Sequence, residues 1–286
     1  MAVVNTNVNA SIAQNALVRN ERSMNTAMER LSTGQRINSA ADDAAGLAIG
    51  SRMTSQIRGL DVGIRNANDA ISMVATADGA LIEVTNMLQR MRELALQASN
   101  GTTTSADRSY LSSEYANLLA EIDRIAENTQ WNGNTILNHI TTASSTFKYQ
   151  VGANGGQTIA VDFGNMTDTV SGVFTEIKAS HSVITSTTTA SALTQGTSAV
   201  VAIDSAITAV NSQRATFGAA MNQLTYAVDN LSNVKVNSEA ARSRIVDTDY
   251  ATETSELARI QIIQQAGTAM LAQANQMPQT VLSLLQ

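Results

Sequence analysis

Apolar residues at the end of this chain recur at alternating steps of three and four, and this spacing constrains the fold more than any other feature. The series consists of Ile260, Ile263, Gly267, Met270, Ala274, Met277, Val281 and Leu284. Such spacing predicts a helix that buries one narrow face against another helix. The segment from Tyr250 to Gln286 is therefore expected to need a helical partner.

The first forty residues carry a matching series with a single polar member, Asn20. Its positions are Ala10, Ala13, Leu17, Asn20, Met24, Ala27 and Leu31. Each series is too narrow to stabilise an isolated helix, because most helical stability in proteins comes from tertiary packing. The two series are most simply satisfied by each other or by copies of the same chain. We predict paired N- and C-terminal helices.

Composition excludes several classes of protein. Aromatic residues make up 3 % and charged residues 15 % of the 286 residues, which argues against a thick globular enzyme core. A net charge of −6 argues against a nucleic-acid partner, which would need a basic face. The absence of cysteine excludes disulfides and thiolate metal sites. No apolar run is long enough for a membrane span, and charged residues at 19–22 argue against a cleaved secretory signal.

The middle of the chain predicts long helices that fold back on one another. The first helix is expected from about Asn5 to Leu31, with Gly34 as its left-handed cap. A capping box of Ser39 and Asp42 is expected to start a second helix that ends near Ser99 and is about 80 Å long. A third helix is expected over 106–128, antiparallel to the second. A last series over 203–231 contains Arg214, which is expected either to set the register by pairing with a carboxylate or to snorkel to the surface, and not to bind a ligand.

Two further segments depart from the helical pattern. Phe147, Tyr149 and Val151 alternate with polar residues, as do the apolar positions over 159–163, and Asn154-Gly155-Gly156 lies between them. This pattern predicts a β-hairpin near residues 147–163 whose aromatic face packs on the helices. The stretch 181–198 holds ten Ser or Thr residues in eighteen, and it predicts an exposed loop outside the core.

We therefore predict a mainly α fold of long antiparallel helical rods with a β-hairpin. Residues 1–43 and 244–286 are assigned to a terminal coiled-coil domain. Residues 44–175 and 199–243 are assigned to a rod domain, and 176–198 to a Ser/Thr-rich exposed excursion, which is also a candidate for O-linked glycans.

Candidate catalytic groups are sparse. The only histidines, His139 and His181, have no metal-binding spacing, and no Gly-rich phosphate loop is present. Asp42 and Asp43 are adjacent carboxylates, but adjacent helix residues point apart and helix N-termini favour acids. The sequence predicts no enzymatic activity, no cofactor and no metal.

Several separated blocks of the chain resemble bacterial flagellins. Near the N-terminus, 36–40 (RINSA) and 42–49 (DDAAGLAI) resemble the family's first signature, and 89–95 (QRMRELA) resembles its rod segment. At the other end, 247–251 (DTDYA), 264–267 (QQAG) and the residues that follow to Leu285 resemble its C-terminal signature. Ala41 and Gln286 depart from the pattern, where lysine and arginine are common. The resemblance covers nearly the whole chain.

The resemblance implies a structural subunit that self-assembles into the helical filament of the bacterial flagellum for swimming, in a short form without large outer domains. Expected partners are further copies of the chain, the flagellar cap and hook-associated proteins, an export chaperone and the flagellar type III export apparatus, and the expected location is the extracellular filament. The residues expected to pack in the filament core are Leu17, Met24, Leu31, Ile260, Ile263, Met270, Met277, Val281 and Leu284.

The resemblance also implies two immune-recognition surfaces. Arg90, Leu94 and Glu114 match residues that a flagellin-sensing Toll-like receptor contacts, and we expect Arg90 and Leu94 to be partly exposed beside the packed seam. Leu282, Leu284 and Leu285 match terminal leucines read by cytosolic sensors, although we favour packing in the filament core as their role. One alternative remains open from the sequence, a hook–filament junction protein. A secreted coiled-coil adhesin or effector would be expected to carry a distinct binding domain, and none is visible.

Overall fold

The structure, a computed structural model, describes residues 7–138, 146–167, 174–178 and 189–283, with side chains described over 196–276 in the last stretch. The chain divides into two compact units, residues 1–57 with 236–286 and residues 58–235. Helices α2 (Ala44–Ala98) and α5 (Thr189–Val246) contribute residues to both units. Each unit is described below by itself.

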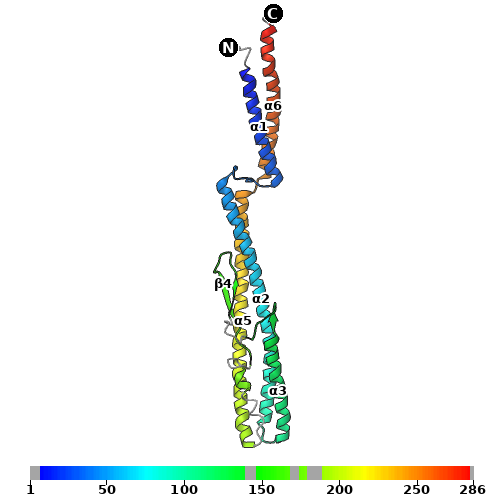
Figure 1. Cartoon of the computed structure of the whole chain (residues 1–286), viewed down its shortest axis with the longest axis vertical. Helices are drawn as coiled ribbons and strands as arrows, with labels where there is room; N and C mark the ends of the chain where they lie inside the picture. Colours follow the sequence, from blue (N-terminus) through cyan, green and yellow to red (C-terminus); the bar gives the residue numbers. More distant parts are fainter. Residues whose placement is uncertain (1–6, 139–145, 168–173, 179–188, 284–286) are drawn as a thin grey trace. The chain divides into compact units, whose positions relative to one another are not determined.

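The first unit contains the paired terminal helices. Helices α1 (Val8–Thr33) and α6 (Tyr250–Ser283) lie side by side and antiparallel, which confirms the predicted pairing (Figure 1). As predicted, α1 ends at Gly34, whose φ of 70° is left-handed and whose N–H donates to the Arg30 carbonyl. Helix α6 continues through Pro278 to its end at Ser283, so proline does not end it there.

Helix α2 is capped by a different residue from the one expected. The Asp43 Oδ1 accepts the Gly46 N–H at 2.9 Å, and the helix begins at Ala44. Ser39 instead donates its N–H to the Asp42 carboxylate at 2.8 Å within a turn that precedes the helix. The prediction of a Ser39–Asp42 capping box was wrong, because these two residues form the turn and the next carboxylate caps the helix.

The second unit is built on three helices, α2, α5 and α3 (Ser105–Asn128). Helix α3 begins with a capping box in which Thr104 and Asp107 exchange hydrogen bonds. Large side chains from all three helices and the β-hairpin fill one continuous core. Its fully buried members include Leu81, Leu88, Met91, Tyr115, Ile122, Phe163 and Phe217.

Ion pairs between α2 and α5 show that the two helices are antiparallel. Asp61 pairs with Lys235 at 2.6 Å, whereas Arg92, further along α2, pairs with the earlier residue Asp204 at 2.7 Å. Between these pairs, Arg214 donates to an Asp78 oxygen at 2.8 Å. The predicted carboxylate partner of Arg214 is therefore present.

The predicted β-hairpin is formed by β3 (Thr146–Gln150) and β4 (Thr158–Asp162). Its register pairs Phe147 with Val161 and Tyr149 with Ile159, which places the apolar side chains on one face. That face packs against the helices as expected, and the Tyr149 hydroxyl lies 3.0 Å from the Met73 sulfur. A second, two-residue pair, β1 (Gln130–Trp131) with β2 (Asn134–Thr135), encloses a turn at Asn132 and Gly133, both of which have positive φ.

Glycine on α2 allows the hairpin to lie against the helix backbone. A Cβ at Gly63 would lie 2.5 Å from the Val151 carbonyl oxygen, and one at Gly59 would lie 3.0 Å from the Ala153 Cβ. Beside these glycines, the Asn66 amide donates to the Gln150 carbonyl at 2.9 Å. At Gly59 and Gly63 no side chain therefore separates the helix from the hairpin, and the Asn66–Gln150 hydrogen bond holds the hairpin in place.

The Ser/Thr-rich stretch is partly helical. Residues 189–198 form the first turns of α5, whereas residues 179–188 lie outside the described part of the chain. Gly196 is buried, and a Cβ there would collide with the Ser99 side chain. The prediction of a loop was wrong over 189–198, which is helical, because close packing at Gly196 supports a helix that composition alone does not favour. The predicted exposure holds at Thr197 and Ser198, and the side chains of 189–195 lie outside the described ones.

Candidate functional site

Two asparagines, the N-cap Asn7 and Asn20 of the N-terminal series, anchor α1 on the backbone of α6. The Asn20 amide donates to the Ile260 carbonyl at 3.0 Å, and the Asn7 amide donates to the Ala274 carbonyl at 2.9 Å. Asn7 also caps α1 by accepting the Ala10 N–H. Because both bonds connect early residues to late ones in antiparallel order, they set the register of the helix pair.

Small residues bring the two helices close together between these anchors. A Cβ at Gly267 would lie 2.8 Å from a methyl carbon of Leu17, so glycine is needed for that contact. Ala27 and Ile260 are almost fully buried at 2 % and 3 % exposure. Arg30 and Glu253 add an ion pair at 3.7 Å. The buried line between α1 and α6 is therefore narrow, as the spacing of the two series predicts.

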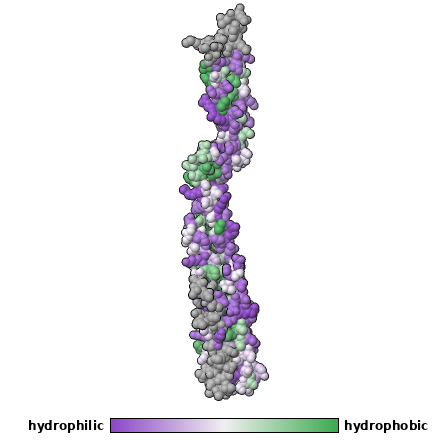
Figure 2. Space-filling model, viewed as in Figure 1, coloured by the Kyte–Doolittle hydropathy of each residue, from purple (hydrophilic) through white to green (hydrophobic). Residues whose placement is uncertain are grey.

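Many large apolar side chains on the same two helices are left uncovered. The aliphatic and methionine side chains that are more than a third exposed are Val8, Ile12, Val18 and Met28 on α1, and Ile262, Ile263 and Met270 on α6. Hydrophobic residues are visible among polar ones on this part of the surface (Figure 2). A groove of about 160 Å³ lies between the helices, lined by Ala13, Ala16, Leu17, Asn20, Ile263, Gly267 and Met270. The exposed apolar residues on α1 and α6 make this helix pair the candidate interaction site.

The predicted filament-core residues differ widely in burial within one chain. Ile260 is buried, and Leu17, Met24 and Leu31 are half-buried. Ile263 is 45 % and Met270 is 65 % exposed, because α1 covers only one edge of the α6 series. The side chains of Met277 and Val281, and all of Leu284, lie outside the described residues. Their packing in a filament stays a prediction.

A pair of backbone hydrogen bonds joins the two connecting segments of this unit. The Arg36 N–H donates to the Val246 carbonyl at 2.7 Å, and the Thr248 N–H donates to the Gly34 carbonyl at 3.0 Å. The Arg36 guanidinium adds a bond to the Ile245 carbonyl at 2.7 Å. Sequence reasoning missed this link, because backbone pairing between distant segments leaves no periodic signal.

Two of the carboxylates in these connecting segments have lowered pKa values. The pKa of Asp249 lies below its ordinary value because the carboxylate accepts hydrogen bonds from the Thr252 hydroxyl and from backbone N–H groups at the start of α6. The pKa of Asp42 is lowered chiefly by the Ser39 N–H and hydroxyl. Both charges are therefore stabilised by the folded backbone.

Acid is expected to destabilise the first unit, because protonation removes the charge of these carboxylates. The stabilising effect of Asp249 is fully present above its unfolded pKa, near 3.8, and is lost as the pH falls through the lower folded-state pKa. Asp249→Asn keeps a capping side chain that does not titrate. The free energy of unfolding is measured by urea unfolding, followed by helical circular dichroism, between pH 6 and pH 2.5. It should fall less steeply with acid in the variant than in the parent, and the difference should be roughly that of one titrating carboxylate. An unchanged acid slope would contradict this role for Asp249.

A second candidate surface surrounds Arg90 on α2. The Arg90 guanidinium donates to the Glu114 carboxylate on α3 through Nε at 3.0 Å and Nη2 at 2.9 Å, and to Glu93 through Nη1 at 2.9 Å. Hydrogen bonds to Glu93 and Glu114 raise the pKa of Arg90 above its ordinary value. The structure thus brings together two of the three residues matched to a receptor contact, which are 24 positions apart in the sequence.

Leu94 does not share the exposure of Arg90. Its side chain is 1 % exposed, whereas about half of the Arg90 side chain is exposed. The expectation that Leu94 is partly exposed was wrong, because α3 and α5 together cover a wider face of α2 than a two-helix seam would. A periodicity argument based on one neighbouring helix underestimates burial when two are present.

Within the described residues, no cluster of three or more His, Cys, Asp or Glu side chains could hold a metal ion. His139 and His181 lie outside the described residues. Asp42 and Asp43 both bind backbone N–H groups, as described above. None of the described helices combines the length and hydropathy that crossing a bilayer requires.

Comparison with known proteins assigns the family. The profile of the bacterial flagellin N-terminal helical region matches residues 4–142, and that of the bacterial flagellin C-terminal helical region matches residues 200–285. The flagellin of Halalkalibacterium halodurans is 44 % identical over 283 residues, covering 99 % of both chains. The chain belongs to the bacterial flagellin family.

Other relatives place this flagellin among the short ones. Flagellin B of Vibrio cholerae is 36 % identical over an alignment of 374 positions that covers 99 % of each chain. Because that alignment has more positions than the 286 residues of this flagellin, the relative carries residues that are missing here. The short form predicted from the sequence is confirmed.

The function follows from the family. This flagellin is a structural subunit of the bacterial flagellar filament. A flagellar hook-associated protein from Vibrio parahaemolyticus shares the fold, with a TM-score of 0.57 over 72 % of this chain and all of that chain. At 18 % identity that likeness shows the fold alone, so it does not favour the junction-protein alternative.

Proposed function

We propose that this flagellin polymerises through the uncovered apolar residues of α1 and α6, with the paired terminal helices forming the inner core of the filament. The observation that supports this proposal most directly is the exposure of seven large apolar side chains on these two helices. An isolated chain exposes them to water, whereas neighbouring copies would cover them. Burial of apolar surface contributes roughly 25 cal/mol per Å², so assembly would be driven mainly by these contacts.

The contact between copies would be heterologous. The exposed residues of α1 and of α6 differ in type and spacing, so one helix pair presents two different surfaces to its neighbours. A heterologous contact that does not close into a ring produces an open helical fibre.

Seeded growth tests this proposal. Purified chain added to short filament fragments should elongate them into filaments of micrometre length, seen by electron microscopy, because each added copy covers the apolar face of the last. A hook–filament junction protein would add a single layer and stop. Chain that stays soluble in the presence of competent seeds would contradict the proposal.

The proposed partners follow from the same exposed surface and from the family resemblance. An export chaperone would cover apolar residues near the C-terminus before assembly, and the flagellar type III apparatus would carry the chain out of the cell. The cap and hook-associated proteins would meet the two ends of the filament. We also propose that the chain has no catalytic activity, since its carboxylate pair and ion pairs serve structural contacts.

Arg90 and Glu114 are proposed as contacts for a flagellin-sensing Toll-like receptor. Their guanidinium–carboxylate pair is half-exposed and would form new hydrogen bonds with a partner at modest cost. We expect Arg90→Ala to lower receptor activation by monomer in a reporter-cell assay by about tenfold, a loss equivalent to roughly 1.4 kcal/mol. Leu94 would act by supporting the helix face, because it is buried.

Arg124→Ala is the matched control for this prediction. Arg124 forms a comparably exposed pair with Glu121 on α3, two helical turns beyond Glu114, and neither residue is among those matched to the receptor. It should leave activation within about twofold of the parent, since exposed pairs contribute little to stability. Equal potency of Arg90→Ala and Arg124→Ala would remove Arg90 from the receptor site. The terminal leucines proposed for cytosolic sensors, Leu282, Leu284 and Leu285, lie outside the described side chains.

A further inference from the structure

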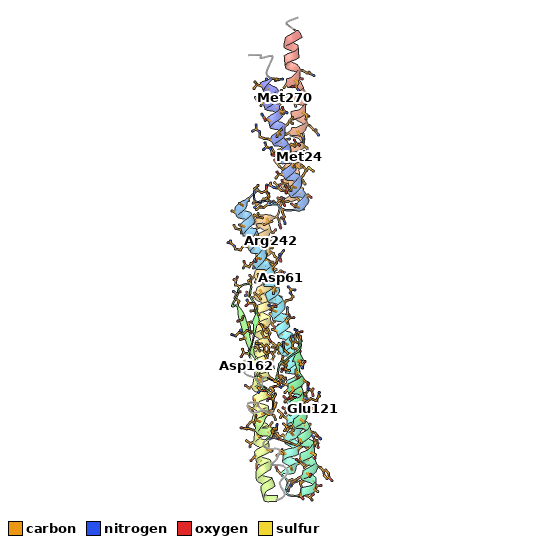
Figure 3. The ribbon with its side chains drawn as sticks, in the orientation of Figure 1. Met24, Asp61, Glu121, Asp162, Arg242 and Met270 are labelled. Carbon is orange, nitrogen blue, oxygen red and sulfur yellow. The ribbon has the colours of Figure 1, made fainter. Side chains whose placement is uncertain are left out.

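The methionines whose side chains the structure describes range from buried to exposed: Met28 and Met270 are exposed, Met24, Met53, Met87 and Met221 are half-buried, and the remaining three are buried. Among those whose side chains the structure describes, Met28 on α1 is 54 % exposed and Met270 on α6 is 65 % exposed. In the second unit, by contrast, Met73, Met91 and Met166 are at most 5 % exposed. The most exposed methionines therefore lie on the two helices that carry the uncovered apolar surface. Figure 3 labels Met270 on α6 and Met24 on α1.

We propose that Met28 and Met270 are sites of sulfur oxidation by peroxides, and that their oxidation blocks addition of the chain to a filament. This inference rests on the proposed function, in which α1 and α6 supply the contacts between copies. Hydrogen peroxide is the oxidant. The sulfur lone pair attacks one oxygen of the peroxide and forms an S–O bond while the O–O bond breaks; the transferred oxygen gives its proton to the departing hydroxide, so the products are a sulfoxide, oxidised by two electrons, and water.

Accessibility decides which methionines react. Peroxide must approach the sulfur atom, so a thioether on the surface reacts while one inside a packed core is shielded. Met270 lines the groove between α1 and α6, which is open to solvent. Met24 lies one turn from Met28 on the same helix but is half-buried, and it provides an internal comparison. Both residues are in the tryptic segment 23–30.

A sulfoxide at Met270 would change the chemistry of the groove. Apart from Asn20, the residues that line it are Ala, Leu, Ile, Gly and Met, and the Asn20 amide already donates to the Ile260 carbonyl. A sulfoxide oxygen buried there by a neighbouring copy would find only one remaining side-chain donor in the groove lining, the second N–H of the Asn20 amide, which is already held at the Ile260 carbonyl. Burying a polar group without a hydrogen bond is unfavourable, so the modified chain should not be retained at the growing end.

The first measurement is the order of oxidation. Folded monomer is treated with hydrogen peroxide for increasing times, quenched with catalase, digested and analysed by mass spectrometry with fragmentation that separates the methionines. Met28 and Met270 should oxidise at least about tenfold faster than Met73, with Met24 slower than Met28. In assembled filaments Met270 should be protected. Equal rates at Met270 and Met73 would overturn the assignment of the sites.

The second measurement is seeded growth with variants. Oxidised parent chain should elongate seeds at least about tenfold more slowly than untreated chain, and methionine sulfoxide reductases should restore growth. The double variant Met28→Leu, Met270→Leu should elongate at the same rate before and after peroxide, because leucine keeps the volume without the sulfur. Met73→Leu is the control variant and should remain sensitive.

Two outcomes would overturn the proposal. One is oxidised parent chain that elongates seeds normally, and the other is a double variant that loses growth after peroxide as the parent does. The double variant could fail to elongate seeds even before treatment. In that case the oxidised parent chain is treated with the reductases, and its growth should return at the rate at which Met28 and Met270 are reduced; growth that does not follow their reduction overturns the proposal. Failure of untreated parent chain to elongate would contradict the proposed function instead, so the two failures are distinguishable.

Discussion

Removing residues 267–286 is expected to abolish filament growth while leaving the unit of residues 58–235 folded. The deletion takes away Gly267 and Met270, which line the groove against α1, and the Ala274 carbonyl that accepts the Asn7 amide. Residues of the second unit make none of these contacts. Seeded elongation by electron microscopy should fall to background, whereas thermal unfolding of the remaining helices should persist.

A point substitution separates loss of helix pairing from loss of chain length. In Gly267→Leu the new side chain meets Leu17, since even a Cβ at this position would lie 2.8 Å from it. The variant should also fail to elongate seeds, because α1 and α6 can no longer approach. Gln265→Ala, an exposed change nearby on α6, should elongate normally. A truncated chain that grows at the parent rate would show that α6 is not the polymerisation element.

Phe163→Ala is expected to lower the free energy of unfolding of the second unit by about 3–5 kcal/mol. Phe163 is fully buried directly after β4, with its ring centroid 5.2 Å from that of Phe147 on β3 and 5.1 Å from that of Phe217 on α5. Removing the ring leaves a cavity where the hairpin meets the helix, and it removes two aromatic contacts. Urea unfolding monitored by circular dichroism measures the change.

Tyr226→Ala serves as the control for that measurement. Tyr226 is on α5, as Phe217 is, but its side chain is 75 % exposed. Its loss should change the free energy of unfolding by no more than about 0.5 kcal/mol, which is typical of surface positions. Similar losses for the two variants would indicate that the hairpin does not share the helical core.

Local signals in the sequence were reliable where a single contact decides the structure. Gly34 caps α1 in the left-handed conformation, Phe147 and Tyr149 lie on one face of a hairpin, and Arg214 has a carboxylate partner in its seam. Each of these follows from backbone conformation or periodicity within a few residues. Three separated signature blocks were likewise enough to indicate the family.

Local signals failed where a third element intervened. Leu94 was placed beside a two-helix seam, but α3 and α5 both cover that part of α2, and the side chain is buried. Residues 189–198 read as a polar loop, yet Gly196 packs against Ser99 and the helix extends through them. In both cases the prediction used the composition or periodicity of one segment, and these do not show how many other helices pack against that segment.

The sequence by itself determined that two narrow apolar series at opposite ends of the chain must find helical partners, because neither can be stable alone. The tertiary structure decided how much of that need is met within one chain. It buries Ala27 and Ile260 between α1 and α6, ties Asn7 and Asn20 to carbonyls of α6, and leaves Ile263 and Met270 exposed. Two cylinders can share only one line of contact, so the remaining apolar surface is left for other copies of the chain.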